Sequence, residues 1–170
     1  MAKALLITRE DLVKKTKLNG NVSTDEFIQF VEIAQDTHIQ NYLGTDLLEK
    51  IQSLISAGTI GDVGNEVYND LLTDLVKPML IHFAVMEFLP FAAFTISNKG
   101  IYKHFSENSE TATKEEIDFL VEKHRKIAEH YTQRFIDFMC NNSSSYPEYN
   151  SNTNEDMNPD KSTNFSGWQI

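Results

Sequence analysis

Apolar side chains recur at three- and four-residue intervals along much of the chain, which is the spacing of one face of an α-helix. Between residues 23 and 44 the opposite face is polar and carries Glu32, Asp36 and Gln40. The apolar positions of this segment are Phe27, Val31, Ala34, His38, Ile39 and Tyr42. The pattern predicts a helix that buries one side.

A second and more regular apolar seam follows residue 113. Its positions are Ile117, Val121, His124, Ala128, Tyr131, Phe135 and Phe138, widened by Leu120 and Ile127. A seam of this length predicts one long helix that packs lengthwise against another element. That element lies either within the same subunit or in a neighbouring one.

Helix starts are marked by a hydroxyl residue with a carboxylate three positions later, a pair that satisfies free amides of the first turn. The pairs are Thr8 with Asp11, Ser23 with Glu26, and Thr113 with Glu116. Gly44 and Gly58 stand where a left-handed residue ends a helix, and Thr45 is a candidate cap for the helix between them. We therefore expect helices that end near Lys15, at Gly44 and at Gly58.

The segment from Asn65 to about Ser97 is apolar on most sides, so it is expected to lie in the core. Pro78 lacks an amide to donate and predicts a kink, and Pro90 is a candidate for a second one. Apart from residues 3–8 and 100–105, which are candidates for extended chain, no stretch suggests a strand. The predicted fold is all-α, a compact bundle of about five helices with a kinked central helix.

The composition changes after Cys140, because half of the last 30 residues are Asn, Ser or Thr. Such a segment buries too little apolar area to offset its ordering entropy alone. The sequence therefore predicts a helical body over 1–140, able to fold without the rest, and an extended polar C-terminal arm over 141–170. The arm's candidate partner-binding residues are its aromatic and large apolar side chains, Tyr146, Tyr149, Phe165, Trp168 and Ile170.

Charge and cysteine content limit the possible partners. The 170 residues include 25 acidic and 15 basic side chains, giving a net charge of −10. An acidic surface argues against tight wrapping of nucleic acid or binding to an anionic membrane. Cys140 is the single cysteine and indicates a reducing compartment. The first residues do not form a signal peptide, and the apolar stretch 79–96 contains charged and proline residues that disfavour a membrane span.

Residues that carry chemistry are few, and no catalytic, cofactor-binding or metal-binding residue is assigned. His124 and His130 are six positions apart and lie on different sides of a helix, so they do not form a metal motif. His82 and His124 are interpreted as core histidines, with a backbone or carboxylate partner for His82. The glycines of 58–64 are interpreted as an interhelical turn, and Cys140 as a buried or indifferent thiol. An enzyme with a pocket beside His82 and Glu87 is the less favoured alternative.

A family resemblance rests on residues 7–48 and on later fixed points. The first part reads Ile7-Thr8-x-x-Asp11-Leu12-x-Lys14, then Asp25, Phe27, Ile33-Ala34-Gln35, Ile39, Leu43-Gly44 and Leu47-Leu48. It resembles the opening of the head–tail connector, or adaptor, proteins of tailed bacteriophages. Leu71-Leu72, Leu75, Lys77-Pro78 and Asn98-Lys99-Gly100-Ile101, with the Asn-rich tail, are more closely similar to the neck ring proteins of crAss-like phages. The resemblance covers about residues 1–140.

The resemblance implies a virion structural protein, made in the host cytoplasm and located in the neck at the head–tail interface. Such a subunit forms a homo-oligomeric ring, most often a dodecamer, that binds the portal and contacts adjacent neck or tail proteins. The ring connects capsid to tail and lines the conduit through which DNA passes during ejection without sequence-specific binding. No cofactor and no membrane is implied. The alternatives are a small acidic phage regulatory or interaction protein and another neck or tail-completion ring component.

Overall fold

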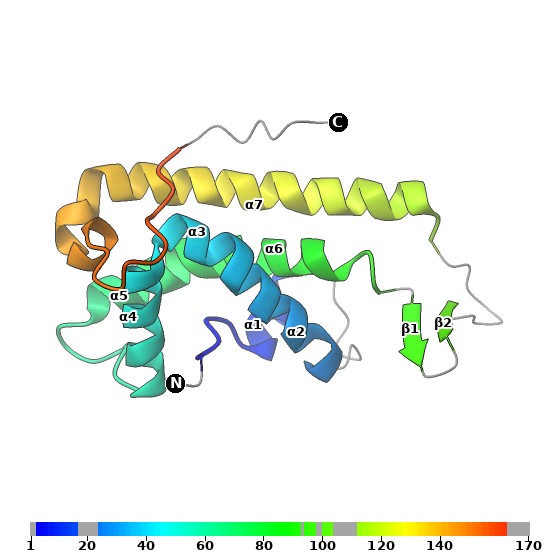
Figure 1. The fold of residues 1–170 in the computed structure, drawn as a ribbon, viewed down its shortest axis with the longest axis horizontal. Coiled ribbons are helices and arrows are strands. Elements are labelled where there is room, and N and C mark those ends of the chain that lie inside the picture. Colours follow the sequence, from blue (N-terminus) through cyan, green and yellow to red (C-terminus); the bar gives the residue numbers. More distant parts are fainter. Residues whose placement is uncertain (1–2, 17–23, 93, 98–99, 104–111, 163–170) are drawn as a thin grey trace.

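Helices account for most of the chain in the computed structural model, which describes residues 3–16, 24–92, 94–97, 100–103 and 112–162 (Figure 1). They are α1 (Arg9–Lys15), α2 (Thr24–Ala34), α3 (Gln40–Leu43), α4 (Thr45–Ser56), α5 (Glu66–Leu71), α6 (Lys77–Phe88) and α7 (Lys114–Asn142). A π turn over Gln35–Ile39 joins α2 to α3, and another over Leu72–Val76 joins α5 to α6. The described residues therefore form five helical rods, which confirms the predicted all-α class.

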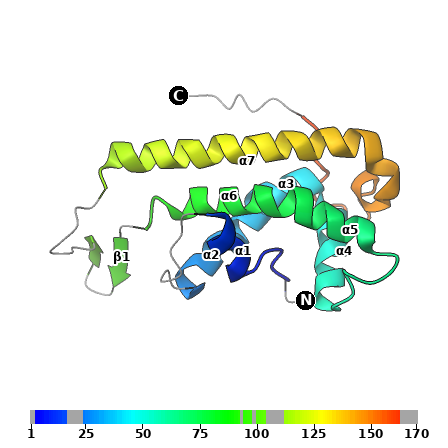
Figure 2. The ribbon, with the colours of Figure 1, turned by 180° about the vertical axis from the view of Figure 1, so that it is seen from behind.

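The rod α5–α6 is the centre of the fold, and α7 runs lengthwise beside α6 (Figures 1 and 2). The α2–α3 rod packs across α6, and α4 turns away from it at the α3 end. The middle of α6 is apolar all round, and Met79, Leu80 and Ile81 have no exposed surface. This confirms the predicted core position for α6, whereas the end of the predicted segment lies outside the core, with Phe91 53% and Phe94 40% exposed.

Two prolines are candidates for kinks in the central segment, and a distortion of the helix accompanies only Pro78. The distortion predicted at Pro78 is present as the π turn Leu72–Val76, which ends just before it. Because proline has no amide to donate, a local change in the ladder of hydrogen bonds accommodates it. Pro90 causes no second kink, since α6 already ends at Phe88.

Two of the three expected capping boxes are present. The side chains of Thr8 and Asp11 exchange hydrogen bonds with each other's amides, and Thr113 and Glu116 do the same. Ser23 lies outside the described residues. Asp11 also pairs with Lys77 at 3.0 Å, which ties α1 to the central rod.

Gly44 and Gly58 have φ angles of +77° and +69°, as expected of residues that end helices. The expected role of Thr45 is wrong: Gly44 caps α4, and Thr45 is already its first residue. The hydroxyl of Thr45 instead binds a distant part of the chain.

Residues 3–8 do not form a strand, because they are bound to a helix rather than to another extended segment. Gln35 is buried, and its amide accepts from the N–H of Leu6 at 3.1 Å and donates to the carbonyl of Ala4 at 3.1 Å. The other candidate is confirmed over its described part. Strands β1 (Phe94–Ser97) and β2 (Gly100–Lys103) form an antiparallel hairpin with Phe94 opposite Lys103.

Candidate functional site

The described part of the predicted arm, residues 141–162, is part of the body. After α7 the chain turns back through two short 3₁₀ helices, Ser143–Ser145 and Pro147–Asn150, and residues 146–162 cross the α3–α4 end of the fold (Figure 1). We call residues 146–162 the C-terminal strap. Its path differs from the extended arm that the composition predicted beyond residue 140.

Tyr146 and Tyr149, two of the predicted partner-binding residues, are buried in the protein's own core and anchor the strap there. The Tyr146 ring meets Tyr68 edge-on at 5.7 Å, and its hydroxyl donates to the carbonyl of Val67 at 3.1 Å. Tyr149 packs edge-on against Phe135 of α7, with ring centres 6.0 Å apart. Burial raises the pKa of Tyr149 to about 12, so its phenol stays neutral.

Asp46, in the first turn of α4, binds the middle of the strap. One of its carboxylate oxygens accepts from the N–H and the hydroxyl of Thr153 and from the hydroxyl of Ser151, each at 2.8 Å. The backbone hydrogen bond from Thr153 is the main cause of a lowered pKa of Asp46. The buried carboxylate therefore stays charged and holds a loop that has no regular structure of its own.

Asp156 and Met157 make the next set of bonds. The carboxylate of Asp156 accepts from the hydroxyl of Thr45 at 2.8 Å and from the amide of Gln40 at 3.2 Å. The backbone N–H of Thr45 donates to the carbonyl of Met157 at 3.0 Å. Thr45 thus joins the strap to the start of α4, which explains its presence at that position better than capping does.

The end of the strap lies directly against Gly44. A Cβ atom on Gly44 would stand 2.7 Å from Cδ of Pro159, which is closer than real contacts allow. One residue later, the N–H of Asp160 donates to the carbonyl of Asn41 at 2.8 Å. Gly44 is therefore required both for its positive φ and for the close approach of the strap.

A comparison with protein families covers α3, α4 and most of the strap. A family profile matches residues 39–158, from the π turn before α3 to the end of the strap's contacts with α4. The chain belongs to DUF6712, a family of unknown function. No curated protein and no solved structure matches the chain.

The DUF6712 match includes the C-terminal strap as far as Asn158 and leaves out residues 159–170. Of the predicted partner-binding residues, Tyr146 and Tyr149 thus lie inside the family unit. Phe165, Trp168 and Ile170 lie outside both the match and the described residues. A partner-binding role for these three stays a prediction.

The DUF6712 core contains a pair of histidines between α6 and α7. Nδ1 of His82 lies 3.0 Å from Nδ1 of His124, and the ring of Tyr131 stacks on His82. Burial, and then the neighbouring His124, lower the pKa of His82 to about 4. Both rings are half-buried, as expected of core residues, but the partner of His82 is a histidine rather than a backbone or carboxylate group.

Glu87 does not share a site with His82. Its carboxylate pairs with Nε2 of His38 at 2.8 Å, and the His38 ring stacks flat on Phe83 at 4.1 Å. The enzyme alternative required His82 and Glu87 to face one pocket. In the structure each faces a different partner on a different helix.

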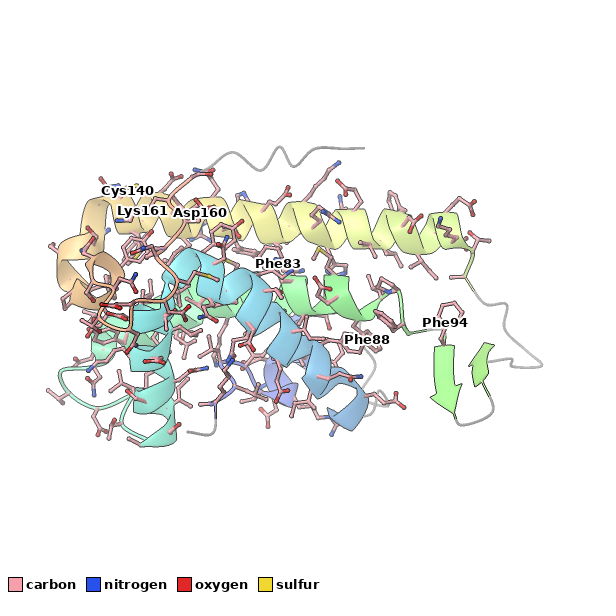
Figure 3. The ribbon with its side chains drawn as sticks, viewed as in Figure 1. Phe83, Phe88, Phe94, Cys140, Asp160 and Lys161 are labelled. Carbon is pink, nitrogen blue, oxygen red and sulfur yellow. The ribbon has the colours of Figure 1, made fainter. Side chains whose placement is uncertain are left out.

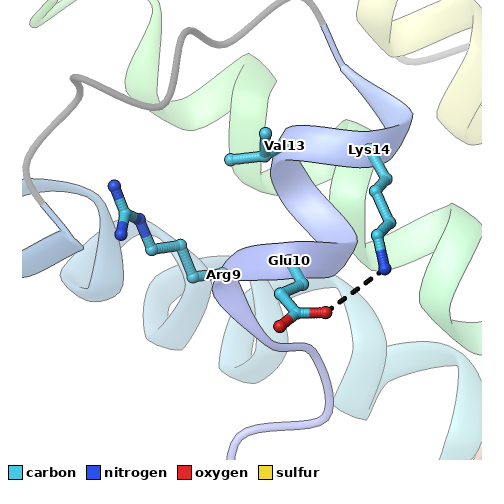
Figure 4. Close-up of a pocket in the computed structure, with 4 residues that line it drawn as sticks. All are labelled: Arg9, Glu10, Val13 and Lys14. Atoms are coloured by element: carbon cyan, nitrogen blue, oxygen red, sulfur yellow. Dashed lines mark hydrogen bonds and ion pairs between the residues drawn. The ribbon is translucent and has the colours of Figure 1, made fainter.

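Other features of the described residues suggest little chemistry. A shallow hollow of about 290 Å³ lies on α1 beside Arg9, Glu10, Val13 and Lys14, where Lys14 pairs with Glu10 at 3.2 Å (Figure 4). Cys140 is exposed, which contradicts a buried thiol. Within the described ranges, no three His, Cys, Asp or Glu side chains gather as a metal site, and none of the helices has the length and apolar character to cross a membrane.

Four large apolar side chains are exposed on elements towards the end of the DUF6712 fold opposite the strap. Phe91 is 53% exposed, Phe94 40%, Phe119 69% and Leu120 43%. Phe91 follows α6 and lies 5.5 Å from the ring of Phe30 in α2, whereas Phe119 and Leu120 lie in the first half of α7. Phe94 is the first residue of β1, towards the same end of the molecule (Figure 3). The sequence pattern predicts the apolar seam that contains Leu120. It does not show which half of α7 is covered by the other helices and the strap.

Proposed function

We propose that the chain is a structural subunit of a head-to-tail adaptor ring in a tailed bacteriophage. The ring would contain several copies, bind the portal on one face and contact neck or tail proteins on the other. The resemblance of residues 7–48 and of the later motifs to connector and neck ring proteins is the reason to consider this role. The location would be the virion neck.

The observation that carries the proposal is the uneven burial of α7. Its fully buried side chains all lie between Ala128 and Met139, although the apolar seam begins at Ile117. Phe119 and Leu120, at the other end of the same helix, are exposed. The seam residues of that half, Ile117 and Val121, are only half-buried. The 29-residue helix therefore leaves apolar surface that other subunits could cover.

The acidic charge is compatible with a channel for DNA. The net charge of −10 would weaken adhesion of the phosphate backbone to the walls of a ring. The same charge also favours the alternative of a small acidic interaction protein. Assembly state separates the two roles, because the alternative requires no closed ring.

The deciding experiment is to combine the full chain with the portal protein of its phage and image the complex. We expect a ring with the symmetry set by the portal, and a pull-down in which the two proteins are retained together. As a control, a chain with Phe119→Asp and Leu120→Asp should fold but be retained poorly. A chain that neither binds the portal nor appears in the neck of the virion would overturn the proposal, and a ring located elsewhere in the neck would support the tail-completion alternative.

A further inference from the structure

Two imidazole rings from different helices meet between α6 and α7. His82 lies in α6 and His124 in the first half of α7, and their Nδ1 atoms are 3.0 Å apart. Both side chains are half-buried, so part of each one contacts solvent. Imidazole nitrogens are the commonest protein ligands of transition metals, and two of them at this spacing are a candidate chelate.

The positions of the two rings are set by the packing of the helices. Tyr131 lies two turns after His124 on the same face of α7, and its ring stacks on His82 with 8° between the ring planes. Met79, one turn before His82, has no exposed surface. The same is true of Ala128, one turn after His124. The two nitrogens are therefore held close together before any ion binds, which lowers the entropic cost of binding.

A hydrogen bond between the rings accounts for their contact in the structure. Burial lowers the pKa of both rings, so each is neutral at neutral pH, and one Nδ1 donates its hydrogen to the other. A neutral imidazole has one nitrogen lone pair to give to a metal, and exchange with water moves its hydrogen from Nδ1 to Nε2. With both hydrogens on Nε2, the two Nδ1 lone pairs are available to the same ion.

The distance between the Nδ1 atoms agrees with two adjacent positions around one ion. A bond from an imidazole nitrogen to a metal is about 2.0–2.1 Å long, which separates two nitrogens by about 2.9 Å at a right angle and about 3.4 Å at the tetrahedral angle. The observed 3.0 Å falls between these values. Right angles are typical of Cu²⁺ and Ni²⁺, and tetrahedral angles of Zn²⁺. Because the Nδ1 atoms face each other, the two rings must turn slightly to direct both lone pairs at an ion beside the line that joins them.

The donor set determines the kind of ion. Nitrogen ligands suit Cu²⁺, Ni²⁺ and Zn²⁺, whereas Mg²⁺ and Ca²⁺ require oxygen ligands. Permanent zinc sites have three or four protein ligands, so a pair of rings is expected to hold an ion that exchanges with solvent and keeps water as its other ligands. The net charge of −10 favours the approach of a dication.

We propose that His82 and His124 bind one divalent transition-metal ion, Cu²⁺, Ni²⁺ or Zn²⁺, through their Nδ1 atoms. The ion replaces the hydrogen bond between the rings and joins α6 to α7. Its position is one turn before Ala128, where the fully buried part of α7 begins. On the other side of the pair, Ile117 and Val121 are only half-buried, so the ion clamps the less covered half of α7 against α6. This role is independent of the ring assembly proposed above.

Titration calorimetry on the full, untagged chain, freed of metal with a chelator, tests the binding. We expect one Ni²⁺ or Zn²⁺ ion per chain and no binding of Mg²⁺. His82→Gln and His124→Gln each leave a single ligand, so each should weaken binding by roughly 100-fold. His130→Gln is the matched control, because His130 is exposed on the same helix and should leave the affinity unchanged. Absence of binding, or binding that His130→Gln weakens and His124→Gln does not, overturns the proposal.

Wild-type protein provides a test that requires no substitution. Paramagnetic Ni²⁺ broadens the NMR signals of the nuclei closest to it. The imidazole signals of His82 and His124 should therefore disappear at Ni²⁺ concentrations that leave those of His38 and His130 sharp. Broadening that begins at another histidine places the ion elsewhere and overturns the proposal.

Hydrogen exchange separates a structural clamp from an adventitious ion. With saturating Zn²⁺, the amides of residues 117–124 should exchange roughly tenfold more slowly than in the chelator-treated chain. The urea midpoint of the same sample should rise, and a His124→Gln chain should show neither effect. Binding at the pair that protects no amide and leaves the urea midpoint unchanged identifies an adventitious ion only and overturns the clamp.

Discussion

The two halves of α7 have similar apolar patterns and opposite surroundings. In the second half, Ala128, Thr132 and Phe135 have no exposed surface, because α6 and the C-terminal strap cover that end. In the first half, the seam residues Ile117 and Val121 are only half-buried, and Phe119 and Leu120 are exposed. An apolar seam thus shows that one face of a helix is suited to burial. Whether that face is buried within the chain or in an assembly depends on which segment packs against it.

Removing the strap should have the largest effect on the covered half. A chain that ends at Cys140 was expected from sequence to fold, but it lacks Tyr146 and Tyr149, which fill the core. Loss of two buried aromatic side chains should cost on the order of 6 kcal/mol, comparable to the whole stability of a domain. We expect an unfolded or insoluble product, measured by circular dichroism and urea denaturation. A chain that ends at Ser162 keeps the strap and should unfold at the wild-type urea concentration.

The same substitution in each half of α7 should have different effects on the free energy of unfolding. Phe135→Ala removes a fully buried ring and should lower the free energy of unfolding by about 4 kcal/mol. Phe119→Ala removes an exposed ring and should change it by less than about 0.5 kcal/mol. Both values come from urea unfolding of the purified chain. A loss of more than about 2 kcal/mol for Phe119→Ala would mean that the first half is covered within the monomer.

The close approach of the strap to α4 can be tested at Gly44. Gly44→Ala forces a side chain into a positive φ and against Pro159, and we expect a loss of about 2 to 3 kcal/mol. Gly58→Ala is the matched control, since its φ is also positive but no atom lies within 4 Å of the added Cβ. It should lose about 1 kcal/mol, and Pro159→Ala should restore part of the stability only in the Gly44→Ala chain.

The histidine pair should make the contact between α6 and α7 sensitive to acid. The pKa of His82 is lowered to about 4 from an ordinary value of 6.5, so the folded chain prefers the neutral ring. Its contribution to stability is therefore complete above pH 6.5 and is lost as the pH falls from 6.5 towards 4. After allowance for solvent screening of a half-buried ring we expect a loss of roughly 1 kcal/mol. Urea unfolding at both pH values should show a smaller loss in a His124→Gln chain, and an equal loss would exclude the pair as its source.

Sequence reasoning succeeded where the deciding interactions are local. The capping boxes at Thr8 and Thr113 join residues three positions apart, and Gly44 ends a helix through its own φ. The residues within a few helical turns are therefore enough to predict where these helices begin and end. The apolar central rod was also predictable, because a helix that is apolar on all sides has to be buried.

The strap was missed because its partners are distant in the sequence. Asp46 and Thr153 are separated by 107 positions, and neither carries a local signal that names the other. The Asn- and Ser-rich composition predicts a segment with no independent fold, but composition does not distinguish a free arm from a loop that is held by the buried carboxylate of Asp46. The spacing of Tyr146 and Tyr149 after the α7 seam was the one available hint.

The position of the strap after α3 and α4 in the sequence has a consequence for biosynthesis. The helices α3 and α4 are translated early, yet the groups that bind their junction lie between Ser151 and Asp160. The native fold therefore cannot close until the segment up to Asp160 has been translated and has left the ribosome. Premature release after α7 would yield a nascent chain without its closing contacts, exposed to proteases and unfit for assembly.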